Sequence, residues 1–362
     1  MKTSIVSLRE LALEHYRIYV GDIWPSFRKW LSKRAYSQIL VIVDEHTEKD
    51  CLPIFLRESA LVNPMIISIP AGESYKNIQT CTQIWSEMMQ AGADRQSLCI
   101  NLGGGVIGDM GGFCASTFKR GMDFVQMPTT LLSQVDASIG GKLGIDFEEV
   151  KNSVGLFCDP QAVFIDPVFL NTLSEAEIRS GMAEMFKHSL IADAEQWMNL
   201  QNIQDLRTAP WVSLLVPSLQ IKQGIVEEDP YERNIRKALN FGHTIGHAVE
   251  GWGLANNRPL LHGEAVAIGM IAEAYLSHLL LALPESDLHQ ISDFLCSYYP
   301  AYAIDRAIFP DLIDWMKKDK KNERQQINFS LISSIGQYAI NQHATKEQIE
   351  AALQYYCDYS TK

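Results

Sequence analysis

The sequence has little of what marks a secreted, membrane-spanning or nucleic-acid-binding protein. Its seven cysteines are scattered, odd in number and form no CxxC pair, which argues against a disulfide framework and is typical of a reducing, cytoplasmic compartment. Basic residues are outnumbered: 31 Lys and Arg against 43 Asp and Glu give a formal net charge of −12, so we expect no nucleic-acid partner and no binding to anionic membranes. No stretch reaches the about 18 consecutive apolar residues of a membrane span, and the first residues contain no apolar signal-peptide core.

What the sequence does have is the composition of an ordinary soluble globular protein. Its 362 residues, of which 47% are hydrophobic and 20% charged, are enough for a large buried core and predict two domains. Because the overall charge repels anions, an anionic substrate would need a local cluster of basic side chains.

The first half of the chain alternates short apolar runs with segments of helical spacing, such as Asn77–Ala91 and Val106–Phe118. This alternation predicts a mostly parallel sheet covered by helices on both faces. The runs expected to form buried strands are Gln38–Asp44, Met65–Ile69, Ser97–Leu102, Phe124–Met127 and Ala162–Asp166.

The pattern changes after Pro167, where a capping box at Ser174 begins a long series of helical segments. Only one further strand is expected, near Asn328. We therefore predict an α/β domain over residues 1–170 and an all-helical domain over residues 171–362.

A set of polar residues at helical spacing stands out in the second half. Arg236, Asn240, His243 and His247 are separated by four, three and four positions, which would place them on one face of a helix. Burying such groups costs on the order of several kcal/mol unless each has a partner. A metal ion and an anionic ligand would supply those partners; the alternative is a solvated or packed pair of histidines.

Two further residues favour a metal site. His262 adds a third imidazole, and Glu184 lies in a segment of helical pattern, GMAEMFKH. Two histidines and a glutamate suit a zinc-like ion that keeps an open position and polarises an oxygen atom. The pair is not the HExxH signature of a metalloprotease, because Thr244 stands where that motif requires glutamate. We predict Glu184, His243 and His262 as ligands, and His247 as an acid/base or hydrogen-bonding residue.

A glycine-rich loop follows one of the expected strands. Gly103, Gly105 and Gly108 satisfy GxGxxG, whose glycines let a pyrophosphate approach the backbone at a helix N-terminus; a tight turn would explain them equally. Asp44, at another strand end, is either an acceptor for a ribose hydroxyl or a cap of the next helix. With a third strand-end loop, Ala71–Lys76, these residues predict dinucleotide binding.

The segment Pro128–Asp146 sets isolated polar and charged residues among small and apolar ones, which indicates groups that face a ligand. Basic residues elsewhere complete a set that suits a small substrate bearing phosphate and carboxylate, although each alone is typical of a surface. They are Arg120, Lys142, Lys151, Lys187, Lys222, Arg236 and one or both of Lys320 and Lys321.

With these residues assembled, the chain resembles the 3-dehydroquinate synthase family of sugar-phosphate cyclases along nearly its whole length. The resemblance implies a Rossmann-like N-terminal domain, a helical C-terminal domain, an active site in the cleft between them, and a homodimer. The motifs that carry it, in the family's order and approximate spacing, are GGGVIGD, FKRG, PTTLLSQVDASIGGK, the pair Lys151–Asn152, GMAEMFKH, LNFGHTIGHA, HGEAVAIGM and DKK.

The resemblance also implies cofactors and site residues. Zn²⁺, for which Co²⁺ can substitute, would be bound by Glu184, His243 and His262. NAD would be held by Asp44, Glu73, Lys76, Gly104, Gly105, Val106, Asp109, Thr129, Thr130, Lys142, Lys151 and Thr172. Catalytic roles would fall to Lys142, Lys187, Lys222, Arg236, Asn240 and His247, with further substrate contacts from Arg120, Asp136, Asn152 and Lys320.

The implied reaction converts 3-deoxy-D-arabino-heptulosonate 7-phosphate to 3-dehydroquinate and phosphate. It is a carbon–oxygen lyase step of the shikimate pathway, which leads to chorismate and the aromatic amino acids. NAD⁺ would transiently oxidise the substrate, phosphate would leave by β-elimination, the hydride would return, and an intramolecular aldol would close the ring.

Two other enzyme classes remain as alternatives. A sister cyclase that makes an amino-dehydroquinate, a valiolone or a deoxy-inosose would share the metal and NAD sites; the intact set Arg236, Asn240 and His247 favours dehydroquinate. A metal-dependent alcohol or glycerol dehydrogenase would catalyse a net redox reaction. One departure from the family pattern is a slightly long spacer before His262, at Asn256–Pro259.

Overall fold

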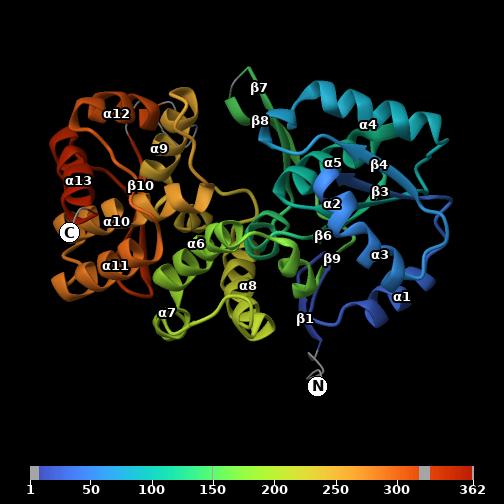
Figure 1. The fold of residues 1–362 in the computed structure, drawn as a ribbon, viewed down its shortest axis with the longest axis horizontal. Helices are drawn as coiled ribbons and strands as arrows, with labels where there is room; N and C mark the ends of the chain where they lie inside the picture. Colours follow the sequence, from blue (N-terminus) through green and yellow to red (C-terminus); the bar gives the residue numbers. More distant parts are fainter. Residues whose placement is uncertain (1–7, 149, 318–326, 361–362) are drawn as a thin grey trace. The chain divides into compact units, whose positions relative to one another are not determined.

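The computed structural model describes residues 8–148, 150–317 and 327–360 (Figure 1). The chain forms two compact units: Met1–Ser174 with Pro210–Gln223, and Glu175–Ala209 with Gly224–Lys362. The expected division into an NAD-binding domain, 1–170, and a domain with the metal and substrate residues, 171–362, stays a prediction.

The first unit is built on a sheet of seven strands in the order β1-β2-β9-β6-β5-β3-β4. All neighbours from β2 to β4 are parallel, and only β1 runs antiparallel to β2. The five strands predicted from the apolar runs are confirmed, whereas β1 and β2 were not predicted. The strands are β1 (Arg9–Ala12), β2 (Arg17–Val20), β3 (Ile39–Asp44), β4 (Met65–Ile69), β5 (Leu98–Gly103), β6 (Asp123–Pro128) and β9 (Ala162–Ile165).

Helices cover both faces of this sheet (Figure 1). Successive residues of β3 alternate between two cores: Leu40 and Ile42 pack with residues of α4 and α5, and Val41 and Val43 with residues of α1 and α3. This is the arrangement expected of a strand buried on both faces. The helices are α1 (Trp24–Ser32), α2 (Glu45–Asp50), α3 (Leu52–Ser59), α4 (Ile78–Gln90) and α5 (Gly105–Thr117).

Shorter elements carry the loops of the first unit. The hairpin β7–β8, which was not predicted, pairs Lys142 with Phe157 at one end and Phe147 with Val150 at the other. The bounds are η1 (Glu73–Tyr75), η2 (Phe118–Arg120), η3 (Ser133–Ala137), β7 (Lys142–Phe147), β8 (Val150–Phe157) and η4 (Pro167–Thr172).

The second unit is mainly helical and also contains one antiparallel hairpin, β10–β11. The strand expected near Asn328 is β10, and its partner β11 was not predicted. Helix α8 (Trp211–Glu228) begins in the first unit and ends in the second. The other elements are α6 (Glu175–Ala192), α7 (Ala194–Gln201), η5 (Ile235–Asn240), α9 (His243–Ala255), α10 (His262–Leu281), α11 (Glu285–Tyr298), η6 (Arg306–Ile308), α12 (Phe309–Lys317), β10 (Phe329–Ser334), β11 (Gln337–Gln342) and α13 (Lys346–Tyr359).

Helix α10 forms the centre of the second unit and packs against α6, α9, α11, α13 and β10. It is long and apolar enough to cross a membrane, with a mean hydropathy of 1.4, yet 67% of that stretch is buried within the protein. Its apolar character is therefore explained by its place in the core.

Candidate functional site

Three predicted metal ligands converge within the second unit. The Nε2 atom of His243 lies 3.4 Å from Oε1 of Glu184, and Nε2 of His262 lies 3.7 Å from the same oxygen. Glu184, in the middle of α6, is fully buried, and the two histidines begin α9 and α10. Two imidazole nitrogens and a carboxylate oxygen facing one point match the donor set of a zinc-like ion.

His247 lies beside this group. Its ring centroid is 5.1 Å from that of His243 and 5.8 Å from that of His262. One nitrogen from each of the three histidines also lies within 4.8 Å of the others, so the three imidazoles form a second candidate ligand set. The geometry thus admits either Glu184 or His247 as the third ligand.

The Nδ1 atoms of His243 and His262 have different partners. The Nδ1 atom of His243 lies 3.1 Å from the backbone oxygen of Phe241, and Nδ1 of His262 lies 3.3 Å from Oε2 of Glu250. Burial lowers the pKa of His262, but hydrogen bonds to Glu184 and Glu250 outweigh it and raise the pKa to about 10. Without a metal ion, the two carboxylates therefore favour a positive charge at this position.

The residues from Arg236 to His247 do not form one helix, and that expectation was wrong. Arg236 and Asn240 lie in η5, and α9 begins only at His243, after a break at Gly242, whose φ is +78°. A Cβ atom at Gly242 would lie 2.5 Å from Cγ of Met270, so only glycine fits this turn against α10. The buried carboxylate of Glu273 accepts hydrogen bonds from the backbone N–H groups of Gly242 and Ile245, and so fixes the start of α9.

Lys187 extends the metal group. Lys187 lies one helical turn after Glu184 on α6, and its ammonium donates a hydrogen bond to Oε2 of Glu184. Both side chains are only 1% exposed. Oε1 of Glu184 is left facing the histidines, while Oε2 holds the lysine. Glu184 can therefore serve a metal ion and a buried cation at the same time.

Arg236 and Asn240 are positioned by acidic residues that were not predicted. Asp229 accepts hydrogen bonds from the backbone N–H groups of Arg233, Asn234 and Arg236, at 2.9, 2.6 and 3.2 Å. Nearby, Nδ2 of Asn240 donates to Oε1 of Glu232 at 2.8 Å. Glu232 has a φ of +56°, a strained conformation for a non-glycine residue. In an acidic chain neither carboxylate carries a sequence signal that separates it from a surface residue.

In the first unit, the predicted NAD-binding segments gather at one edge of the sheet. Asp44 ends β3, the loop with Glu73 and Lys76 follows β4, and Gly104 follows β5. Thr129 and Thr130 follow β6 and Thr172 closes η4, which follows β9. Because these strands are parallel, all of the segments leave their carboxyl ends, and β3 and β5 lie side by side where the strand order reverses.

The glycine-rich loop packs closely at the start of α5. Gly103 ends β5, Gly104 caps α5 without a side-chain hydrogen bond, and Gly105 and Val106 open the helix. A Cβ atom on Gly103 would lie 2.5 Å from Cγ1 of Ile107. Gly104 has no side chain that could accept hydrogen bonds from the backbone N–H groups of the first turn of α5. Backbone N–H groups without such a cap are what an anion-binding helix N-terminus requires.

Asp44 acts as a helix cap in this structure. Its Oδ1 atom accepts hydrogen bonds from the backbone N–H groups of His46 and Thr47, which begin α2. Its Oδ2 atom makes no hydrogen bond within the described part of the chain. The two interpretations of Asp44 are compatible, because one oxygen caps the helix while the other can accept from a ribose hydroxyl.

Lys76 links two of the predicted segments. Its Nζ atom donates to Oδ2 of Asp109 at 2.7 Å and to Oδ1 of Asn152 at 2.6 Å. Asn152 lies on the β7–β8 hairpin with a φ of +50°, and its backbone N–H donates to Asp146. The structure thus brings a predicted substrate residue to two predicted NAD residues.

The other basic residues of the first unit occupy separate places. Lys222 donates to Oδ1 of Asp136 at 2.7 Å. Arg120 ends η2 with a φ of +70°, directly after Lys119 at +49°, so the FKRG loop is strained. Lys142 begins β7 and Lys151 lies on β8, both exposed. Lys320 and Lys321 lie outside the described residues.

The long spacer before His262 forms an ordered loop. The guanidinium carbon of Arg258 lies 5.8 Å from the ring centroid of Trp252 and 4.8 Å from that of Tyr302. Its Nη2 atom donates to the backbone oxygen of Ala303 at 2.9 Å. The extra length is therefore held against neighbouring side chains.

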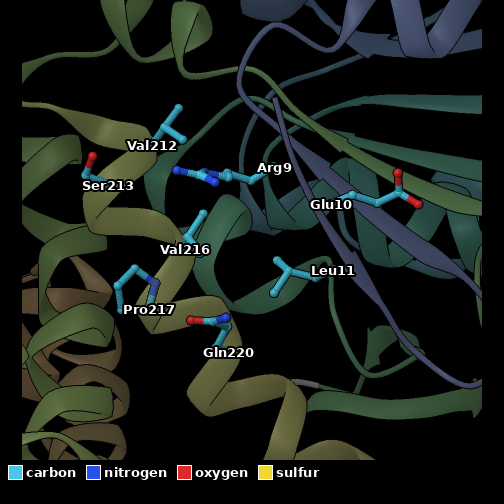
Figure 2. Close-up of a pocket in the computed structure, with 8 residues that line it drawn as sticks. All are labelled: Arg9, Glu10, Leu11, Val212, Ser213, Val216, Pro217 and Gln220. Atoms are coloured by element: carbon cyan, nitrogen blue, oxygen red, sulfur yellow. The ribbon is translucent and has the colours of Figure 1, made fainter. Parts of the chain in front are cut away.

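A separate groove of about 480 Å³ lies in the first unit (Figure 2). Residues of the edge strand β1 line one side, and residues of α8 the other. None of the residues predicted to bind metal, NAD or substrate contributes to it. The lining residues are Arg9, Glu10, Leu11, Val212, Ser213, Val216, Pro217 and Gln220.

Solved structures with the same fold include a valiolone synthase and an inosose synthase. The 2-epi-5-epi-valiolone synthase of Streptomyces hygroscopicus, solved with NAD⁺ and Zn²⁺, is 26% identical with a TM-score of 0.84, covering 97% of this chain and 98% of that chain. A 2-deoxy-scyllo-inosose synthase, solved with carbaglucose-6-phosphate, NAD⁺ and Co²⁺, has a TM-score of 0.82 at 22% identity, covering 96% and 99%. The expected fold class is confirmed.

Sequence comparison identifies the branch of this fold. The family model 3-dehydroquinate synthase N-terminal matches residues 66–180, and 3-dehydroquinate synthase C-terminal matches residues 181–322. The 3-dehydroquinate synthase of Parabacteroides distasonis is 43% identical over 337 residues, which cover 92% of this chain and 96% of the relative. The chain belongs to the 3-dehydroquinate synthase family.

Proposed function

We propose that the chain converts 3-deoxy-D-arabino-heptulosonate 7-phosphate to 3-dehydroquinate and phosphate. The observation that carries this proposal is the convergence of Glu184, His243 and His262 beside Lys187, in a chain 43% identical to a 3-dehydroquinate synthase. Loss of phosphate by elimination would make the enzyme a carbon–oxygen lyase.

Zn²⁺ or Co²⁺ is proposed on Glu184, His243 and His262. The donor set fits, since two imidazole nitrogens face the carboxylate oxygen at 3.4 and 3.7 Å, and three protein ligands would suit a catalytic ion that also binds substrate. Glu184 and Glu250 lie 3.7 and 3.3 Å from the ring nitrogens of His262, and their two carboxylates would stabilise positive charge at this point.

NAD is proposed at the carboxyl edge of the sheet in the first unit. Gly104, Gly105 and Val106 would hold the pyrophosphate with the backbone at the start of α5, and Oδ2 of Asp44 would accept from a ribose hydroxyl. The remaining residues proposed to contact NAD are Glu73, Lys76, Asp109, Thr129, Thr130, Lys142, Lys151 and Thr172.

When bound, NAD would supply reversible hydride transfer and the divalent ion would polarise a substrate oxygen. The chain's own basic groups would hold the anionic substrate and offset the negative charge that develops as phosphate leaves. We assign this role to Lys142, Lys187, Lys222 and Arg236, and substrate contacts to Arg120, Asp136, Asn152 and Lys320.

Proton transfer is assigned to His247, held at ring distances of 5.1 and 5.8 Å from His243 and His262. An imidazole can both accept and donate a proton, which the ketone and ring-opening steps require. Asn240, fixed by Glu232, would position the substrate beside it.

We further propose a cytoplasmic homodimer, with residues 1–170 as the NAD-binding domain and 171–362 as the domain that carries the metal ligands. The family resemblance supports the dimer. The edge strand β1 adds support, since it pairs only with β2 within the described residues and borders the groove in Figure 2.

The deciding assay measures phosphate release from the heptulosonate phosphate with NAD⁺ present in far less than stoichiometric amount. Many turnovers per NAD⁺, without accumulation of NADH, are expected. NADH that accumulates in proportion to substrate consumed, without phosphate release, would instead identify an alcohol dehydrogenase.

A sister cyclase is the second candidate, because a valiolone synthase has the same fold at 26% identity. The family resemblance argues against it, because cyclases whose substrate lacks the carboxylate typically alter Arg236, Asn240 and His247, and all three are present here. Competition of the heptulosonate phosphate with a sugar phosphate that lacks the carboxylate separates the two: we expect strong preference for the acid.

A further inference from the structure

The two histidines proposed as metal ligands are held by different kinds of acceptor. His243 is oriented by a backbone carbonyl, that of Phe241, which no side-chain substitution can remove. His262 is oriented by a side chain, the carboxylate of Glu250, at 3.3 Å from Nδ1. A proton on Nδ1 of each ring satisfies both hydrogen bonds and leaves Nε2 deprotonated for a metal ion.

Glu250 shares a face of α9 with the proposed site. His243, His247 and Glu250 are separated by four and three positions, so their side chains project from the same side of the helix. One helix thus supplies a ligand, the proposed acid/base residue and the group that holds the next ligand. The side chain of Glu250 is 15% exposed and that of His262 is 26% exposed, so water competes only partly for their contact.

We propose that Glu250 is a positioning residue that turns Nε2 of His262 toward the metal ion and raises the affinity of the site for it. This inference rests on the metal site proposed above. The hydrogen bond fixes the tautomer and the ring orientation of His262, and the carboxylate charge makes the imidazole a stronger donor. Glu250 itself does not contact the ion.

The alternative is that Glu250 only braces α9 against α10. A brace would stabilise the chain with and without metal and would leave the intrinsic affinity for the ion unchanged. Metal affinity, measured apart from the stability of the metal-free chain, therefore separates the two roles.

The experiment compares the full-length wild type with Glu250→Ala, Glu250→Gln and Glu250→Asp. Zn²⁺ dissociation constants are measured by competition with a chromophoric chelator, and the visible absorption of bound Co²⁺ reports the ligand geometry. Thermal unfolding of each metal-free chain is recorded in parallel. Glu285→Ala is the matched control, because Glu285 forms an exposed pair with His289 at 4.0 Å on α11, a helix that carries none of the proposed ligands.

We expect Glu250→Ala to raise the Zn²⁺ dissociation constant about 10- to 100-fold and to change the Co²⁺ spectrum. Glu250→Gln, whose amide oxygen can still accept from Nδ1, should weaken binding less. Glu250→Asp keeps the charge but shortens the reach, and should bind more weakly than Glu250→Gln. Glu285→Ala should match the wild type.

An unchanged dissociation constant and Co²⁺ spectrum in Glu250→Ala would overturn this inference alone. If that variant does not fold, an Asp variant that binds as tightly as the Gln variant or the wild type overturns it. A wild-type chain that binds neither Zn²⁺ nor Co²⁺ overturns the proposed metal site as well, so the two failures are distinguishable.

Discussion

The Nζ atom of Lys76 lies 2.7 Å from Oδ2 of Asp109, and this ion pair ties the loop after β4 to helix α5. Burial lowers the pKa of Lys76, but the carboxylates of Asp109, Glu73 and Asp146 together raise it above its usual value. Burial also raises the pKa of Asp109, and Lys76 opposes this only in part. Each of the two charges is therefore stabilised in part by the other.

Removal of the lysine alone should destabilise the chain. Lys76→Met leaves Asp109 as an uncompensated carboxylate and should lower the free energy of unfolding by about 3 kcal/mol. The double variant with Asp109→Asn should recover about 1 kcal/mol or more of that loss. Urea denaturation of the four proteins of this cycle measures the coupling, and strictly additive effects would contradict it.

Gly111 is predicted to be intolerant of alanine although it lies inside a helix. Gly→Ala in a helix interior normally stabilises by about 1 kcal/mol. A Cβ atom on Gly111, however, would lie 2.2 Å from the buried Oδ1 of Asn101. Gly111→Ala should therefore destabilise by about 1–3 kcal/mol. Gly224→Ala in α8, where nothing lies within 4 Å, is the control and should be neutral or stabilising; equal effects at both positions would refute the packing argument.

Removal of the metal ion tests the assignment of ligands. A chelator should abolish turnover, and Zn²⁺ or Co²⁺ should restore it. His243→Ala should weaken metal binding by more than about 100-fold, whereas His247→Ala should keep the ion within about tenfold and lose about 10²- to 10⁴-fold in kcat. Equilibrium metal titration with activity measured alongside checks both. Loss of the ion from His247→Ala, with retention in Glu184→Gln, would select the set of three histidines.

Asp166 should make stability depend on pH. Burial raises its pKa to about 6, despite hydrogen bonds from the backbone of Val168 and from Nε1 of Trp24. The folded state therefore keeps a proton that the unfolded state releases between about pH 4 and pH 6, and stability from this group falls as pH rises through that window. Across this window the contribution of Asp166 to the free energy of unfolding falls by about 3 kcal/mol.

Asp166→Asn should remove this pH dependence. The difference in unfolding free energy between variant and wild type should move in favour of the variant by about 3 kcal/mol from about pH 4 to pH 7. Chemical denaturation across this range measures it. Asp166→Asn also loses the hydrogen bond from Trp24, which changes the unfolding free energy by the same amount at every pH. A difference between variant and wild type that does not vary with pH would therefore contradict the raised pKa of Asp166.

The buried strands of the first unit could be predicted because each is a short apolar run. The β7–β8 hairpin could not be, since Gly144 and Gly155 face each other across it and glycine is a weak strand signal. A Cβ atom on Gly155 would lie 2.2 Å from the backbone oxygen of Leu143, so close strand contact, and not propensity, explains that residue.

The cluster of Glu184, His243 and His262 could be predicted from residue type and spacing, but the backbone that carries it could not. The spacing of Arg236 to His247 suggested one helix, whereas Gly242 breaks it where η5 meets α9. Glu250 and Glu273, which hold His262 and the start of α9, are single carboxylates in an acidic chain. Only their contacts distinguish them from solvated surface residues.

The side chain of Arg258 anchors the loop that connects α9 to α10. The guanidinium of Arg258 packs on the rings of Trp252 and Tyr302, and these contacts hold the chain four residues before His262, where α10 begins. Residues Asn256 and Asn257 at that tip are exposed. A peptide tag inserted between them would leave the loop anchor in place, which makes this turn a site for labelling or immobilising the enzyme with its ligand helices intact.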